Sequence, residues 1–116
     1  MRNKFREFDP VDSRHKGIPG FRQDALNSAS VILVGAGGLC GEIAEGLVRK
    51  GVGKLIVCDG DIVEPSNLNR QLFLARDVSK NKAIRLAKNL CPMGPMGTEI
   101  TAFPLLFQEA VEKGEI

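Results

Sequence analysis

The spacing of apolar residues along this chain changes repeatedly, and each change predicts a switch between strand and helix. Continuous apolar runs at 31–34 and 55–58 predict two short buried strands, and alternation at 99–103 predicts a third. Between them, apolar residues recur at helical spacing over 40–50 and 77–90. Strands that alternate with helices pair in parallel through right-handed crossovers. The pattern therefore predicts an α/β fold with a mainly parallel sheet.

Shorter patterns flank this unit. Residues 1–20 are polar and rich in turn formers, which predicts an extended arm, and 21–26 and 106–113 have the spacing of short helices. Gly51 is well placed to end the first long helix, and Ser79 to begin the second as its N-cap.

Glycines follow the first predicted strand directly. Gly35, Gly37, Gly38 and Gly41 stand between that strand and the first long helix. A strand, a glycine turn and a helix form the opening unit of nucleotide-binding α/β folds, in which a phosphate lies at the helix N-terminus. The third position of G-x-G-x-x-G is Cys40, and the glycine comes one residue late. A tight turn that binds no ligand remains an alternative for this stretch.

Acidic, amide and basic residues gather after the second predicted strand. Asp59 lies 24 residues after Gly35, about where such folds place the carboxylate that holds the ribose hydroxyls. The alternative is a turn aspartate beside Gly60. The following loop, 62–75, carries Asn67 and Arg70 beyond the strand end, where open α/β sheets bind ligands. A guanidinium there suits a phosphate oxygen, although a surface arginine is also common.

The second long helix carries a basic face. A solvated surface explains Lys80, Arg85 and Lys88. Lys82 differs, because it lies at the helix start, near the expected phosphates.

Composition excludes several classes of protein. The net charge is +2, and the chain has neither Trp nor Tyr, so we expect no aromatic platform for nucleic acid. No apolar run reaches the length of a membrane span, and the first residues lack the apolar segment of a signal peptide. The three cysteines, Cys40, Cys58 and Cys91, are widely spaced, which argues against a disulfide framework or a zinc site. We expect reduced thiols and a cytoplasmic location.

Two segments together resemble the ThiF/MoeB/HesA family, which includes the ubiquitin-activating enzymes. They are VILVGAGGLCG and KGVGKLIVCDGDIVEPSNLNRQLFLARDVSKNKA, and the resemblance covers residues 26–92. It implies a Rossmann-like three-layer βαβαβ fold that binds ATP. It also implies adenylation of the C-terminal glycine carboxylate of a ubiquitin-like or sulfur-carrier protein, with release of pyrophosphate.

The resemblance assigns roles to individual residues. An arginine near the N-terminus is expected to reach into the ATP site of a second subunit in a homodimer; Arg14 is the candidate, and Arg22 competes with it. Contacts to the phosphates in catalysis are expected from Asn67, Arg70 and Lys82, and nucleotide binding from Gly35, Gly37, Gly38, Asp59 and Asp61.

The resemblance also implies parts that these residues do not supply. The Mg²⁺-binding aspartate and any catalytic or zinc-binding cysteines are expected beyond Ile116. We therefore expect an arm with a short helix at 1–26 and the N-terminal half of an adenylation domain at 27–116. That half is expected to be inactive alone.

Other functions remain open from the sequence. One is adenylation of a small-molecule or tRNA-linked carboxylate, and another is a non-catalytic regulatory subunit. A dehydrogenase also uses a glycine turn and an acid, but it leaves SNLNRQ and Lys82 unexplained.

Overall fold

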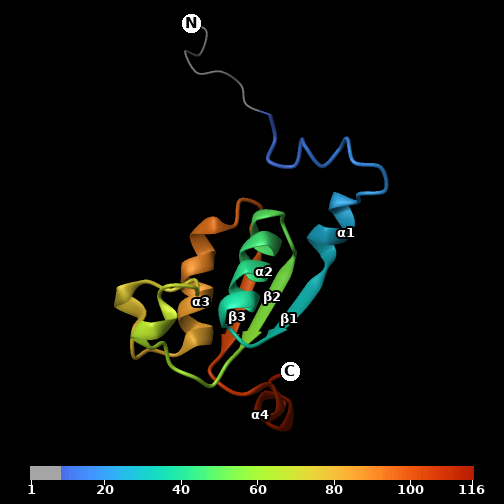
Figure 1. Cartoon of the computed structure of the whole chain (residues 1–116). Helices are drawn as coiled ribbons and strands as arrows, with labels where there is room; N and C mark the ends of the chain where they lie inside the picture. Colours follow the sequence, from blue (N-terminus) through green and yellow to red (C-terminus); the bar gives the residue numbers. More distant parts are fainter. Residues whose placement is uncertain (1–8) are drawn as a thin grey trace, which may run out of the picture.

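Three parallel strands form the centre of the computed structural model, which describes residues 9–116 (Figure 1). The strands lie side by side in the order β1-β2-β3. The register places Val31 beside Leu55 and Leu55 beside Ile100, so equivalent residues of all three strands share one face. The predicted α/β fold with a parallel sheet is confirmed. The strands are β1 (Ser30–Val34), β2 (Lys54–Cys58) and β3 (Glu99–Phe103).

Two helices connect the strands, and two shorter helices precede β1 and follow β3 in the sequence. The two longer helices, α2 and α3, are the crossovers that allow the strands to run in parallel. No helix in residues 9–116 combines the length and the apolar character needed to cross a membrane. The helices are α1 (Gln23–Ser28), α2 (Gly38–Arg49), α3 (Lys82–Leu90) and α4 (Phe107–Glu112), with 3-10 turns η1 (Pro65–Asn67), η2 (Ala75–Asp77) and η3 (Cys91–Met93).

The hydrophobic core lies on one face of the sheet only. Leu33 and Val57 point to this face and are buried against α2 and α3, which contribute Val48 and Leu86. On the opposite face Ile32 is 41% exposed and Val34 is 58% exposed. The prediction that 31–34 is buried throughout is therefore wrong for the described chain. Of the three expected layers, residues 9–116 form the sheet and one helical layer.

Two predicted helix boundaries have different outcomes. Gly51 follows α2 with φ of +90°, as expected for a glycine that ends a helix. Ser79 does not cap α3: the helix begins at Lys82, and the N-cap is Asn81, whose side chain accepts a hydrogen bond from the Ile84 N–H. In 77–81 only Val78 is apolar, and the chain leaves a 3-10 turn at Asp77 and passes through a left-handed residue, Ser79, with φ of +72°.

A buried ion pair fixes this connection to α3. Asp77 is fully buried and accepts hydrogen bonds from the Leu74 N–H at 2.8 Å, Asn89 Nδ2 at 2.8 Å and Arg85 Nε at 2.6 Å. Burial raises the pKa of Asp77, but these three hydrogen bonds outweigh burial and hold that pKa below its ordinary value. The interpretation of Arg85 as a solvated surface residue is wrong, because its partner is this buried carboxylate.

Candidate nucleotide site

The glycine turn is fastened to the carboxyl end of β2. The Gly35 N–H donates to the Cys58 carbonyl at 2.8 Å, and Gly35 has φ of +108°, a conformation that side chains oppose. The Asp59 carboxylate accepts hydrogen bonds from the Ala36 N–H and the Asp61 N–H, both at 2.8 Å. The structure thus brings the glycine turn and the predicted ribose-binding acid into contact.

The α2 N-terminus has unpaired backbone donors. Its N-cap is Gly37, which has no side chain to accept hydrogen bonds, and its first turn contains no acidic residue. Within residues 9–116, the N–H groups from Gly37 to Cys40 have no acceptor. Four orphan donors and the positive end of a 12-residue helix therefore face the same point, as an anion site requires.

The two departures of this helix from G-x-G-x-x-G are accommodated. Cys40 is half-buried, with its Sγ 3.8 Å from the Val34 carbonyl oxygen. Gly41 is buried, and a Cβ there would lie 3.4 Å from Leu72 Cβ. The displaced glycine therefore allows the 62–81 connection to pack closely against α2.

A backbone hydrogen bond holds Lys82 beside the carboxyl end of β2. Its N–H donates to the Asp61 carbonyl at 2.9 Å. The two side chains line a polar hollow of about 220 Å³ together with Ile62 and Glu64. The structure therefore brings Asp61 and Lys82 together, with Asp59 two residues away on the same strand end.

Asn81 joins the parts of this cluster and is a residue that the sequence analysis missed. Its Nδ2 donates to the Asp59 carbonyl at 2.8 Å and to the Asp61 carbonyl at 3.3 Å, while its Oδ1 caps α3. One side chain thus ties the end of β2 to the helix that begins with Lys82. The signal available in the sequence was an asparagine directly before the helix, which is a common N-cap.

Asn67 and Arg70 are placed by η1 and differ in their accessibility. Asn67 is buried, and its Oδ1 accepts a hydrogen bond from the Glu64 N–H at 2.8 Å, so it closes the turn. Arg70 is exposed, and its Nη1 donates to the Ser66 carbonyl at 2.8 Å. Arg70 lines a second hollow, of about 410 Å³, with Gly38 at the start of α2.

Arg14 is not brought to this cluster. It is exposed, in a segment that Figure 1 shows beyond the amino end of β1, whereas the glycine turn follows the carboxyl end. A role in a second subunit stays a prediction.

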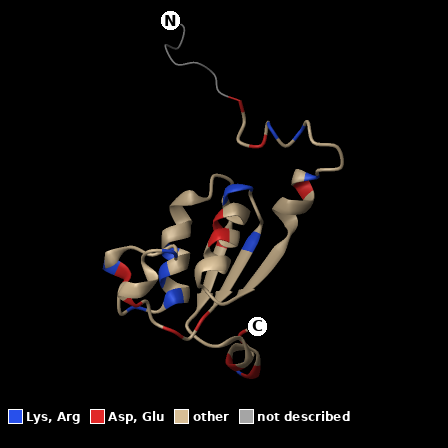
Figure 2. Cartoon of the chain, in the orientation of Figure 1, with Lys and Arg blue, Asp and Glu red and all other residues tan. Residues whose placement is uncertain are grey.

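The arrangement fits a nucleoside phosphate. The orphan N–H groups of α2 suit phosphate oxygens, the Asp59 carboxylate suits ribose hydroxyls, and Lys82 and Arg70 supply positive charge on either side. Figure 2 shows the acidic strand end and the basic positions of α3 at the same edge of the sheet. A dehydrogenase would use the α2 N–H groups and Asp59 but would leave Lys82 and Arg70 without a role.

Comparisons with known proteins show the family of this chain. The model of the ThiF family matches residues 7–113. The chain is 42% identical over 84 residues to a sulfur carrier protein adenylyltransferase of Thermus thermophilus, covering 72% of this chain and 31% of that protein. It is 37% identical over 97 residues to the NEDD8-activating enzyme E1 catalytic subunit of Arabidopsis thaliana, covering 76% and 21%.

Solved structures give the same result. A crystal structure of E. coli MccB with ATP matches with a TM-score of 0.71 and 29% identity, covering 81% of this chain and 28% of that chain. The chain therefore spans about a third or less of these relatives, and the match confirms the Rossmann-like fold.

Proposed function

This chain belongs to the ThiF family, and we propose that it forms the ATP-binding part of an enzyme that adenylates a carboxylate. The proposed acceptor is the C-terminal glycine carboxylate of a ubiquitin-like or sulfur-carrier protein. The observation that carries the proposal is the uncapped α2 N-terminus beside Asp59, with Lys82 fixed to the same strand end. Relatives named as sulfur carrier protein adenylyltransferase and NEDD8-activating enzyme support this choice of acceptor.

The chemistry explains why these residue types gather here. A carboxylate oxygen forms a bond to the α-phosphorus of ATP, the bond from that phosphorus to the bridging oxygen breaks, and pyrophosphate leaves. Two anions must approach each other, and negative charge moves onto the leaving group. In this proposal Lys82, Arg70 and the α2 N–H groups stabilise that charge. The step requires no nucleophile from the protein, because the acceptor carboxylate attacks the phosphorus.

Asn67 has a different role in this proposal. Its side-chain oxygen is occupied by the Glu64 N–H, so only its amide nitrogen is available to a phosphate. We assign Asn67 both to shaping the turn that carries Arg70 and to donating one hydrogen bond.

Further parts of the proposal rest on the sequence and the family. We propose that Mg²⁺ accompanies ATP, that the protein is a homodimer in which Arg14 reaches the partner's nucleotide, and that it acts in the cytoplasm. A smaller acceptor is the second candidate, favoured by the match to MccB, which has been solved both with ATP and with MccA.

ATP–pyrophosphate exchange tests the proposed function. The natural protein is incubated with ATP, labelled pyrophosphate and carrier proteins that end in Gly-Gly, beside carriers whose last glycine is removed. We expect exchange that depends on the terminal glycine and is lost in Lys82→Ala but kept in Lys113→Ala, an exposed lysine on α4's C-cap. Exchange without any carrier, or with peptides only, would favour the smaller acceptor. ATP binding without exchange under any condition would indicate a regulatory subunit.

A further inference from the structure

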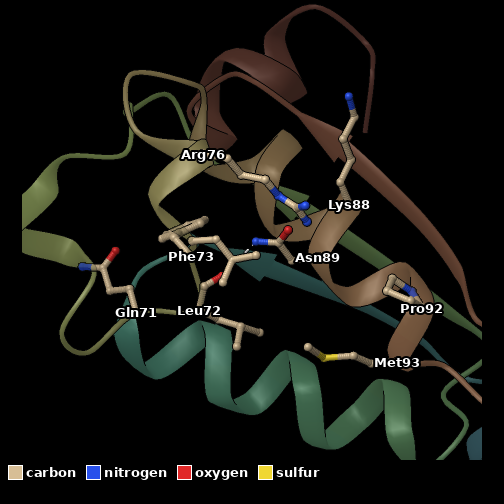
Figure 3. A pocket seen from close by; sticks show the side chains of 9 residues that line it. Gln71, Leu72, Phe73, Arg76, Lys88, Asn89, Pro92 and Met93 are labelled. Atoms are coloured by element: carbon tan, nitrogen blue, oxygen red, sulfur yellow. Dashed lines mark hydrogen bonds between the residues drawn. The ribbon is translucent and has the colours of Figure 1, made fainter.

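A third hollow adjoins the hollow beside Arg70, because Gln71 and Leu72 line both. It holds about 310 Å³ and lies between the 71–76 segment, the end of α3 and η3. Its wall is mostly apolar, with Leu72 and Phe73 on one side and Met93 on the other (Figure 3). This volume accommodates one large apolar side chain, and such a wall with a few polar groups is typical of ligand pockets.

One buried polar atom in this wall has no partner. Asn89 is 8% exposed, and both protons of its Nδ2 are used, by the Asp77 carboxylate at 2.8 Å and the Leu72 carbonyl at 3.2 Å. Because both partners are acceptors, the amide orientation is fixed, and Oδ1 must face the other way. That oxygen is buried and accepts no hydrogen bond within residues 9–116. Gln71 Oε1 is also buried without a donor, but this side chain lies against Gly37 and Gly38 and points away from the cavity (Figure 3). A buried acceptor without a donor is costly, so the wall favours a ligand that brings an N–H group.

The cavity also has a positive rim. Arg76 and Lys88 line it, and neither forms a hydrogen bond or ion pair within the described part of the chain. Figure 3 shows Arg76 extending over the cavity toward Asn89, while Lys88 points away from it. A carboxylate next to the apolar group of a ligand would therefore find an unpaired guanidinium.

We propose that this cavity binds the end of a peptide chain, whose last residue is large and apolar. A single C-terminal residue supplies all three complementary groups: an apolar side chain for the cavity, a backbone N–H for Asn89 Oδ1, and a carboxylate for Arg76. Binding of a peptide in this cavity does not depend on the proposed adenylation. A chain ending in Gly-Gly lacks the apolar group, so the peptide that binds here is not the proposed acceptor.

Fluorescence anisotropy tests this inference directly. The probe is a fluorescein-labelled Gly/Ser peptide that ends in Phe with a free carboxylate, titrated with the natural protein. The comparison peptides end in Phe-amide or in Gly. We expect saturable binding of the Phe acid, with about tenfold or greater weakening for the amide, because a charge-assisted hydrogen bond is lost. The peptide that ends in Gly is expected not to bind.

Two variants with the same change in net charge distinguish a contact in the cavity from the electrostatic effect of the whole protein. Arg76→Glu is expected to weaken binding of the Phe acid about tenfold or more, and Lys113→Glu, an exposed residue after α4, to change it less than about twofold. ATP binding, measured in the same samples, shows that each variant is folded. Equal binding of the acid and amide peptides would overturn the inference. So would binding of an internal Asp-Phe-Asp peptide in preference to the chain end, or no binding by protein that binds ATP.

Discussion

The glycine turn after β1 and the long connection after β2 lie at the same edge of the sheet but are built by different means. The turn is shaped by backbone: Gly35 adopts a left-handed conformation, and the α2 N-terminus offers bare N–H groups. The connection is shaped by buried polar side chains, Asn67, Asp77 and Asn89, each bonded to backbone or to a charged partner. In the proposed function, the first region receives the phosphates, and the second holds Arg70 and Lys82 in place around them.

The difference teaches where a substitution acts. In the turn, the N–H donors have no acceptor within residues 9–116, so we expect changes there to affect ligand binding. In the connection, most polar groups already have partners within the chain, so changes there first affect stability. Measuring both ligand binding and stability in each variant therefore separates the two regions.

The largest expected effect is on stability and comes from Asp77→Ala. The substitution leaves the Arg85 guanidinium, the Asn89 amide and the Leu74 N–H without their acceptor, and breaking such a buried pair costs about 3–5 kcal/mol. Urea unfolding followed by circular dichroism measures the loss. Asp24→Ala removes an exposed pair with Arg22, in which both side chains are about 70% exposed, and is expected to cost far less stability than Asp77→Ala. Equal losses in the two variants would contradict the interpretation of Asp77 as the anchor.

The same carboxylate predicts a pH dependence. Because the folded-state pKa of Asp77 lies below its unfolded value, its stabilisation is fully present above the unfolded pKa. It is lost as the pH falls through the folded pKa. Urea unfolding between pH 7 and pH 2 is expected to show a steeper acid loss in the parent chain than in Asp77→Asn. Parallel curves would mean that another group controls acid unfolding.

Arg70→Ala is expected to lower the exchange rate rather than the stability. Arg70 is exposed and bonds only to Ser66 and Asn69 nearby, so the fold loses little, whereas the developing charge loses a cation. Removing such a group costs about 10²-fold or more in rate. Arg49→Ala, an exposed arginine at the end of α2, serves as the control and should exchange normally. Normal exchange in Arg70→Ala would remove Arg70 from the proposed catalytic set.

Asn81 allows a finer test, because its two functions separate in one substitution. Asn81→Asp keeps the oxygen that caps α3 but cannot donate to the Asp59 and Asp61 carbonyls. We expect Asn81→Asp to lose some stability, because two carbonyls lose their donor, and to have a raised KM for ATP. Asn81→Ala should also lose about 1 kcal/mol of stability through the missing cap. An unchanged KM in both variants would show that Asn81 caps the helix without positioning the site.

Elements that depend on a local pattern of residues could be predicted from the sequence. Elements that depend on contacts between distant side chains could not. Apolar runs predicted β1 and β2, alternation predicted β3, and the glycine cluster predicted the turn into α2. The start of α3 was misplaced because Ser79 is a residue type that commonly caps helices, while the bonds of Asp77 to Arg85 and Asn89 hold this part of the chain in another conformation. The exposure of Ile32 and Val34 was also not predicted. An apolar run does not show whether helices cover one face of the strand or both.

The smallest expected effect is a gain in stability at Ser79. In residues 9–116 it is the one residue other than glycine with positive φ, at +72°, and this conformation costs an L-residue about 1–2 kcal/mol. Its backbone N–H donates to the Val63 carbonyl at 2.8 Å, a bond that glycine keeps. Ser79→Gly should therefore raise the free energy of unfolding by about 0.5 kcal/mol, since the flexibility of glycine in the unfolded chain offsets part of the gain. Ser28→Gly, at the end of α1, should show no gain because a helical residue has negative φ. A loss of stability in Ser79→Gly would mean that the serine side chain stabilises the connection by more than its backbone costs.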